Sequence, residues 1–86
     1  MNTAEVKDTV REYLLREFLP GEDPAELTDE TPLISGAILD SISTLKLVVF
    51  LEEKFEVVVD AYEAGPEHLD NLERIASLID RKTRAA

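Results

Sequence analysis

Apolar residues recur every three or four positions in the first part of the chain, which is the spacing of one buried helix face. The pattern predicts an amphipathic helix over residues 2–19, with Asn2 and Glu5, or Thr3 alone, capping its start. The Pro20-Gly21 pair should end this helix. The side chains on its predicted buried face are Val6, Val10, Tyr13, Leu14 and Phe18.

A second helical pattern, from Ser41 to about Phe55, is apolar on two sides. One stripe is sufficient for packing, so the other is either enclosed by further helices or exposed as a charge-rimmed patch that binds a partner. We favour the exposed patch because it begins beside Ser41. The predicted core face holds Thr44, Leu47, Val48, Leu51 and Phe55, and the predicted partner face holds Ile42, Ser43, Leu45, Lys46, Val49, Glu52 and Glu53.

Between these two helices, residues 20–40 show little periodicity and are interrupted by prolines and a glycine. A connection of this length is uncommon in a small domain and indicates function or disorder. We expect an ordered loop with one helical turn over residues 24–27, because scattered apolar side chains can anchor it to a core. Those side chains are Leu27, Leu33, Ile34, Ile38 and Leu39.

The remainder of the chain predicts one short and one long helix. Residues 56–59 should be an extended link, followed by a short helix near 60–64 that the Gly65-Pro66 pair stops. Tyr62 and His68 are expected to be half-buried loop residues. The last helix should begin near Asp70, with Asp70 and Glu73 forming a capping box. Its predicted buried residues are Leu72, Ile75, Ala76 and Ile79, with Leu69 packed just before its start.

These elements predict an all-α four-helix bundle, with three substantial helices, one short helix and a long first loop, in a single domain over residues 1–86. A chain of 86 residues can bury only about 60 to 65 per cent of its unfolded surface, so there is little room for a deep enzyme cleft. No apolar run is long enough to span a membrane, and the first residues lack signal-peptide features. We therefore expect a cytoplasmic monomer.

The charge is strongly negative and unevenly placed. The net charge is −10, which argues against binding nucleic acid or anionic membranes. Residues 17–73 hold fifteen acidic residues and only two basic ones, Lys46 and Lys54, whereas both ends are mildly basic. The acidic middle is either an ordinary solvated surface or a docking surface for basic enzymes.

The chain contains no cysteine and one histidine, His68. Disulfides and thiolate metal sites are therefore excluded, and we expect no metal. A small enzyme with Ser41 as its nucleophile lacks an evident general base, because only the Asp40 carboxylate lies near it in sequence. We therefore expect no catalytic activity.

Ser41 stands immediately before the apolar helix, where backbone N–H groups and the helix dipole favour negative charge. Asp40-Ser41-Ile42, with the preceding glycine and the following leucines, resembles the attachment motif of the acyl carrier protein family, which usually has leucine after the serine. The resemblance extends over nearly the whole chain. It implies that Ser41 carries 4′-phosphopantetheine from coenzyme A, with Asp40 helping at the helix start and in partner recognition.

The resemblance also implies a function and a set of partners. The thiol of the prosthetic arm would hold an acyl or aminoacyl group as a thioester. The expected partners are a phosphopantetheinyl transferase, an acyltransferase or adenylating ligase that loads the cargo, and a downstream synthase. Ser43 and Lys46 occupy positions that are often acidic in fatty-acid carriers, so we favour a stand-alone carrier of polyketide or nonribosomal peptide biosynthesis.

Two alternatives remain open from the sequence. Within the same class, the Gly-x-Ile-Leu-Asp-Ser approach is also similar to D-alanyl carrier proteins of cell-wall modification. From another class, an acidic helical interaction module, such as an inhibitor or a nucleic-acid mimic, would explain the charge. That module gives no reason for the serine at this junction or for the apolar stripe beside it.

Overall fold

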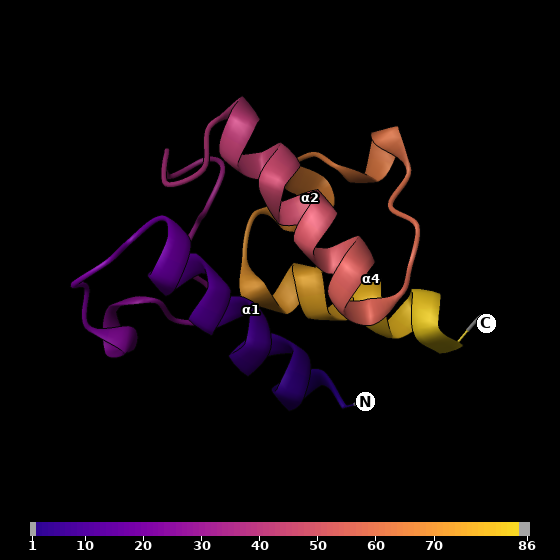
Figure 1. Ribbon diagram of the computed structural model, residues 1–86, viewed down its shortest axis with the longest axis horizontal. Helices are drawn as coiled ribbons and strands as arrows, with labels where there is room; N and C mark the ends of the chain where they lie inside the picture. The colour runs from indigo at the N-terminus through magenta and orange to yellow at the C-terminus, as the bar shows by residue number, and fades with distance from the viewer. Residues whose placement is uncertain (1, 85–86) are drawn as a thin grey trace.

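The computed structural model describes residues 2–84, and the elements within them are helical (Figure 1). The three long α-helices are α1 (Thr3–Glu17), α2 (Ser41–Phe55) and α4 (Leu72–Arg84), and a short α3 covers Pro66–Leu69. Two 3₁₀ turns, η1 (Pro24–Glu26) and η2 (Ala61–Glu63), interrupt the connections. No strand occurs within residues 2–84, so the predicted all-α bundle with a long first loop is confirmed.

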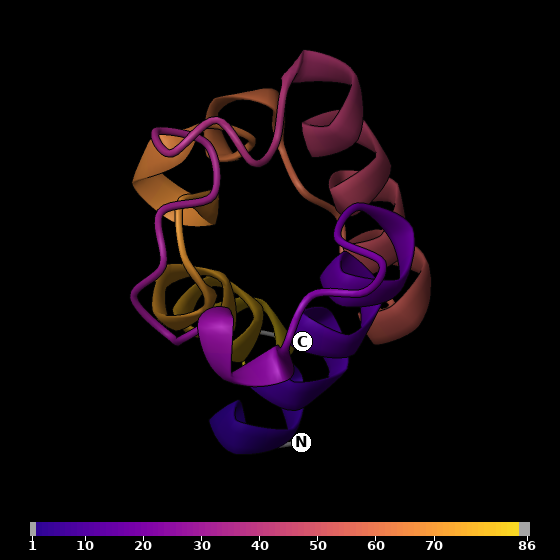
Figure 2. The same ribbon diagram turned by 90° about the vertical axis from the view of Figure 1, so that its left-hand side faces the viewer.

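The helices surround a single core. α1 packs on α4, and α3 packs on α4 and on η2. Viewed along the bundle, α1, α2, α4 and the η2–α3 segment form a ring (Figure 2). Apolar side chains from every part of this ring fill its interior. The fully buried ones include Val6, Val10, Leu14, Leu33, Leu47, Leu51, Leu69, Leu72, Ile75, Leu78 and Ile79.

Local signals in the sequence account for α1 and η1. Asn2 caps α1 by accepting a hydrogen bond from the Glu5 N–H at 2.8 Å, as the capping pattern predicts. α1 ends at Glu17, two residues earlier than expected. η1 forms within the predicted turn, where Asp23 accepts from the Ala25 N–H at 3.0 Å.

The predicted capping box at the start of the last helix is wrong. Asn71, not Asp70, caps α4, accepting from the Arg74 N–H at 2.8 Å. The Asp70 carboxylate instead accepts three hydrogen bonds from the first loop, from the Ile34 N–H, the Ser35 N–H and the Ser35 hydroxyl, at 2.7–2.8 Å. The Asp70 carbonyl also accepts from the Leu33 N–H at 2.6 Å. Asp70 therefore holds the first loop to the end of α3.

The predicted short helical turn ends before Gly65 and Pro66, as expected, but a further helix that was not predicted, α3, begins at Pro66. Proline suits the first position of a helix because its missing N–H would have no intrahelical partner there. The turn before it, η2, lies within the predicted short helix.

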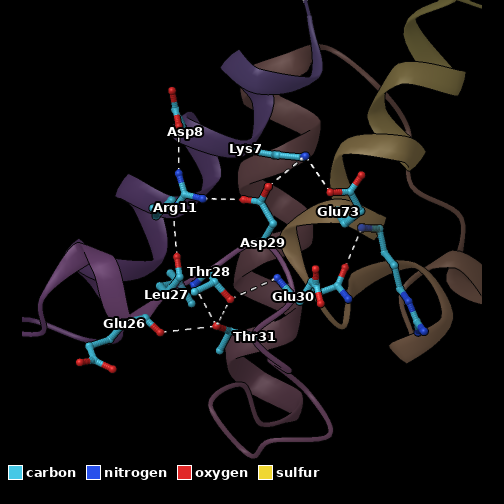
Figure 3. A network of polar contacts seen from close by, with 12 residues as sticks. Lys7, Asp8, Arg11, Glu26, Leu27, Thr28, Asp29, Glu30, Thr31 and Glu73 are labelled. Carbon is cyan, nitrogen blue, oxygen red and sulfur yellow. Dashed lines mark hydrogen bonds and ion pairs between the residues drawn. The ribbon is translucent and has the colours of Figure 1, made fainter.

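A charged network joins α1, the first loop and α4 (Figure 3). Lys7 lies 3.1 Å from Asp29 and 2.7 Å from Glu73. Arg11 lies 2.6 Å from Asp29 and donates to the Leu27 carbonyl at 3.0 Å. Hydrogen bonds that the Lys7 ammonium donates to the Glu73 and Asp29 carboxylates raise the pKa of Lys7 above its ordinary value. Basic side chains from the first helix thus neutralise part of the acidic middle.

The loop makes a tight turn just before α2. Ala37 has a φ of +63°, a conformation that favours glycine. At the neighbouring Gly36, a Cβ atom would overlap the carbonyl oxygen of Pro32. The turn returns the chain to the core, where the N–H groups of Ile38 and Leu39 both donate to the Leu33 carbonyl at 2.9 and 2.8 Å.

The turn generates a prediction of opposite effects at adjacent positions. Ala37→Gly should raise the free energy of unfolding by about 0.5 kcal/mol, because relief of left-handed strain exceeds the added entropy of the unfolded chain. Gly36→Ala should lower the free energy of unfolding by about 2 kcal/mol through overpacking against Pro32. Urea denaturation measures both, and a loss of stability in Ala37→Gly would contradict the strain argument.

A second prediction concerns Asp70. Asp70→Asn should lower the free energy of unfolding by about 2 kcal/mol at neutral pH, because an amide replaces a carboxylate that accepts three hydrogen bonds. Asp80→Asn removes the same charge from an exposed pair with Arg84 and should cost less than about 0.5 kcal/mol.

The Asp70 contribution should also depend on pH. Hydrogen bonds from Ser35 lower the pKa of Asp70 below 3.8, so its stabilising effect is present above pH 3.8 and is lost as pH falls through the folded-state pKa. The stability difference between wild type and Asp70→Asn should shrink over that acid range. A difference that stays constant down to pH 2 would contradict the assignment.

Candidate functional site

Ser41 is the first residue of α2, and its side chain is exposed. Asp40 is the N-cap, and its carboxylate accepts a hydrogen bond from the Ser43 N–H at 2.7 Å. Its carbonyl accepts the first intrahelical bond, from the Thr44 N–H at 2.9 Å. The helix start at Ser41 was predicted from the sequence, whereas the cap at Asp40 was not, and this geometry leaves the Ser41 hydroxyl at the positive end of the helix dipole.

Asp40 acts as a helix cap in this geometry. Hydrogen bonds from Ser43 lower the pKa of Asp40, so its carboxylate is charged at neutral pH. A carboxylate committed to a backbone N–H and with a lowered pKa is a poor general base for the neighbouring hydroxyl. The Asp40 carboxylate therefore serves the start of the helix rather than the Ser41 hydroxyl.

A groove of about 760 Å³ opens beside Ser41, between α2 and the η2–α3 segment. Its lining is mainly aliphatic and includes Ile34, Leu39, Thr44, Leu45, Val48 and Val59. Leu45 belongs to the predicted apolar stripe of α2, but its position at the border of this groove was not predicted.

The expected half-burial is wrong for Tyr62 and confirmed for His68. Tyr62 is 76% exposed and does not line the groove. His68 is half-buried, but it lies in α3 rather than in a loop, 3.3 Å from Arg81, and also does not line the groove. Neither residue belongs to the site.

Polar contacts hold the wall of the groove opposite α2. Glu63 is 7% exposed and lies 2.6 Å from Lys82 of α4, which lowers the pKa of Glu63. Glu63 also accepts from the Asp60 N–H at 2.9 Å, closing a capping box around η2. From α2, the Glu52 carboxylate accepts from the Val59 N–H at 2.9 Å. Glu52 therefore holds the wall as well as bordering the predicted partner face.

The second apolar stripe of α2 is exposed. Ile42, Leu45 and Val49 are 68%, 64% and 45% exposed, so the interpretation that other helices enclose the stripe is wrong. Ser43 is partly buried, whereas Lys46 and Glu53 are exposed.

A second groove, between α1 and α2, continues this stripe. Tyr13 of α1 stacks on Phe50 of α2 with ring centroids 4.0 Å apart, and the Tyr13 hydroxyl donates to the Lys46 carbonyl at 3.3 Å. Tyr13 was predicted to lie on the buried face of the first helix, and Phe50 was assigned to neither face of the second helix. The contact joins residues far apart in the chain, so no local signal could have identified it.

Other site types find no support in the described part of the chain. No group of three residues among 2–84 is arranged to hold a metal ion. No helix within that range is long and apolar enough to cross a membrane.

Comparison with known proteins gives a consistent set of relatives. No protein-family model matches the chain. It is 36% identical over 73 residues to the D-alanyl carrier protein of Streptococcus suis strain 98HAH33, covering 85% of this chain and 89% of that relative. It is 31% identical over 80 residues to the D-alanyl carrier protein of Streptococcus pyogenes serotype M1, covering 93% and 98%. The similarity therefore extends well beyond the residues around Ser41.

Proposed function

The chain belongs to the carrier protein family that includes the D-alanyl carrier proteins, and we propose that it holds its cargo on 4′-phosphopantetheine attached to Ser41. As a carrier it is not an enzyme. The prosthetic group supplies a thiol that binds the cargo as a thioester, and the chain itself contains no cysteine thiol.

The position of Ser41 supports this proposal most directly. Its hydroxyl is exposed at the first position of a fifteen-residue helix, where the helix dipole favours an attached phosphodiester. The Asp40 cap fixes where the helix begins, so the hydroxyl has a defined position for an approaching enzyme. A phosphopantetheinyl transferase would join the Ser41 oxygen to the phosphorus of coenzyme A that bears pantetheine. The diphosphate bond would break, adenosine 3′,5′-bisphosphate would leave, and the transferase would take up the hydroxyl proton.

For the cargo, we propose a D-alanyl group. The relatives are named as D-alanyl carrier proteins, which favours this alternative over a polyketide or nonribosomal peptide pathway. The partners then include an adenylating D-alanine ligase, which loads the thiol, and an enzyme that removes the D-alanyl group. We place loading in the cytoplasm, where coenzyme A and ATP are available.

Tethering is how such a carrier contributes to transfer. A cargo on a short arm reaches a docked active site at a high effective concentration, so each encounter becomes intramolecular. Docking must be weak enough to reverse, since one carrier visits several enzymes. A dissociation constant of about 1 μM, equivalent to about −8 kcal/mol, would suit this exchange.

The central prediction is covalent modification of one serine. Incubation of the purified protein with coenzyme A and a broad-specificity phosphopantetheinyl transferase should add the mass of one phosphopantetheine and one titratable thiol. Ser41→Ala should abolish both changes. Ser77→Ala, at an exposed serine of α4 that lines neither groove, should leave modification at Ser41 intact. Intact-mass spectrometry measures the outcome.

A folded wild-type protein that gains no mass would contradict the carrier proposal. That result would favour the acidic helical interaction module, in which Ser41 only occupies the first turn of α2. Modification that persists in Ser41→Ala would place the attachment elsewhere.

The cargo has a separate test. The phosphopantetheinylated protein should be loaded with D-alanine by a streptococcal adenylating D-alanine ligase and ATP, giving a thioester that neutral hydroxylamine cleaves. L-alanine and acetate serve as matched small cargoes and should load at least about tenfold less. Modification of Ser41 without D-alanine loading would contradict the proposed D-alanyl cargo but not the proposed carrier function.

A further inference from the structure

We propose that a pocket between the end of α1 and the first loop binds an arginine side chain of a partner protein. The pocket has an aliphatic interior and a rim of carboxylates, and its lining includes neither Ser41 nor any residue of α2. It exists whether or not Ser41 is modified, so it can be tested separately from the proposed carrier function.

The interior of the pocket is aliphatic. It has a volume of about 240 Å³ and is lined by Leu15 of α1, by Leu19 just after α1, and by Leu27 and Ile38 of the first loop. Leu27 is 3% exposed and belongs to the core, so it gives the pocket a fixed floor. Small-molecule sites usually occupy about 300–1,000 Å³, so this pocket has room for one side chain rather than for a cofactor.

A hydrogen-bonded turn brings the first loop back over the end of α1. The Leu19 N–H donates to the Leu14 carbonyl at 3.2 Å, and the Glu22 N–H donates to the Leu19 carbonyl at 3.1 Å. Between them, Gly21 has a φ of +88°, a conformation that glycine adopts without strain. The pocket is therefore formed before any partner arrives, and binding does not have to order the loop.

Three carboxylates line the rim of the pocket, those of Glu22, Asp23 and Glu26. Asp23 accepts a hydrogen bond from the Ala25 N–H as the cap of η1. Glu22 and Glu26 are exposed and form no ion pair within residues 2–84. In Figure 3 the Glu26 side chain points away from the charged network that joins α1, the first loop and α4. The rim thus carries negative charge that the described part of the chain does not neutralise.

An aliphatic interior with a carboxylate rim is complementary to a long side chain that ends in a positive charge. Lysine and arginine place their methylene stems on apolar surface and keep the charged head at the boundary with water. The head would meet the Glu22 and Glu26 carboxylates at the mouth of the pocket. A metal ion is a poorer occupant, because no group of three residues among 2–84 is arranged to hold one.

Arginine fits this pocket better than lysine. The two free carboxylates belong to residues four positions apart, and a guanidinium has five N–H donors in a planar fork that can bind both. The lysine ammonium is a compact charge that holds its water more strongly. Arginine is also enriched among the residues that contribute most to protein interfaces.

A partner bound in this way would leave the second helix open. The exposed residues Ile42, Leu45 and Val49 do not line the pocket. Ile38 does line it, three residues before Ser41, so the partner would hold the carrier by the loop that leads to the attachment site. The apolar stripe of α2 would stay available to a second protein at the same time.

The test uses N-acetyl-L-arginine amide, which carries one guanidinium and no charged ends, in place of the partner's arginine. It is titrated into ¹⁵N-labelled protein in exchange for an equal concentration of sodium chloride, so that the ionic strength stays constant. The backbone N–H resonances of Leu19, Glu22 and Ile38 report binding. Their shifts should saturate with a Kd of about 5 mM, as expected for a single side chain.

Two pairs of substitutions separate the rim from the overall charge. Glu22→Gln combined with Glu26→Gln neutralises the rim and should raise the Kd at least about fivefold. Glu12→Gln combined with Glu67→Gln removes the same charge from two exposed residues outside the pocket and should raise it less than about twofold. Asp23 is kept in both, because its removal would disturb η1. Circular dichroism checks that each variant is folded.

Two further probes separate the charge from the stem. N-acetyl-L-citrulline amide keeps the stem without the charge, and methylguanidinium chloride keeps the charge without the stem. Each should bind at least about fivefold more weakly than the arginine probe.

Several results would overturn the proposal. Shifts that do not saturate, or that the Glu22 and Glu26 substitutions leave unchanged, would mean that the probe only samples the acidic surface. Methylguanidinium or N-acetyl-L-lysine amide binding as tightly as the arginine probe would remove the reason for choosing arginine. Magnesium chloride that produces the same shifts at a comparable concentration would assign the rim to a metal ion.

A second copy of the chain is the competing source of the arginine. Sedimentation equilibrium at about 10–200 μM protein should show a monomer, since two chains of net charge −10 repel. A dimer that the Glu22 and Glu26 substitutions dissociate would assign the pocket to self-association and overturn the choice of partner.

Discussion

Two carboxylates hold the connection between α1 and α2, and the rest of the structure depends on them. Asp29 binds Lys7 and Arg11 of the first helix, and Asp70 binds the backbone and side chain of the Ile34–Ser35 segment from the end of α3. Burial of Leu27, Leu33 and Leu39 packs the loop on the core, and the two carboxylates fix its polar groups between these side chains. The loop delivers Asp40 to one position, where its cap starts α2 at Ser41. The location of the site therefore follows from loop anchoring that lies outside it.

Patterns confined to one segment predicted their elements well. The apolar spacing of α1, α2 and α4, the Asn2 cap and the turn at η1 all depend on residues within a few positions of each other, and each is present. The predictions that failed involve residues far apart in the chain. Asp70 has the spacing of a helix cap, but three donors of the first loop compete for its carboxylate. Asn71 therefore caps α4 in place of Asp70. No rule based on local spacing could predict this, because the competing donors lie in the first loop.

The candidate site shows the same division. The start of α2 at Ser41 and the exposed apolar stripe follow from one helix, so the sequence alone predicted them, whereas the cap at Asp40 was not predicted. The groove beside Ser41 also requires η2, which Lys82 of α4 holds through Glu63. The second groove requires Tyr13 from α1. A surface formed by two elements cannot be predicted from the sequence of either one alone. The exposed stripe of α2 was therefore predicted, but the two grooves beside it were not.

Leu45 has a further consequence. Its side chain borders both grooves and is 64% exposed, so the apolar surface that it offers is shared between them. A group beside Ser41 that covers one side of Leu45 leaves less apolar surface to be buried in the groove on the other side.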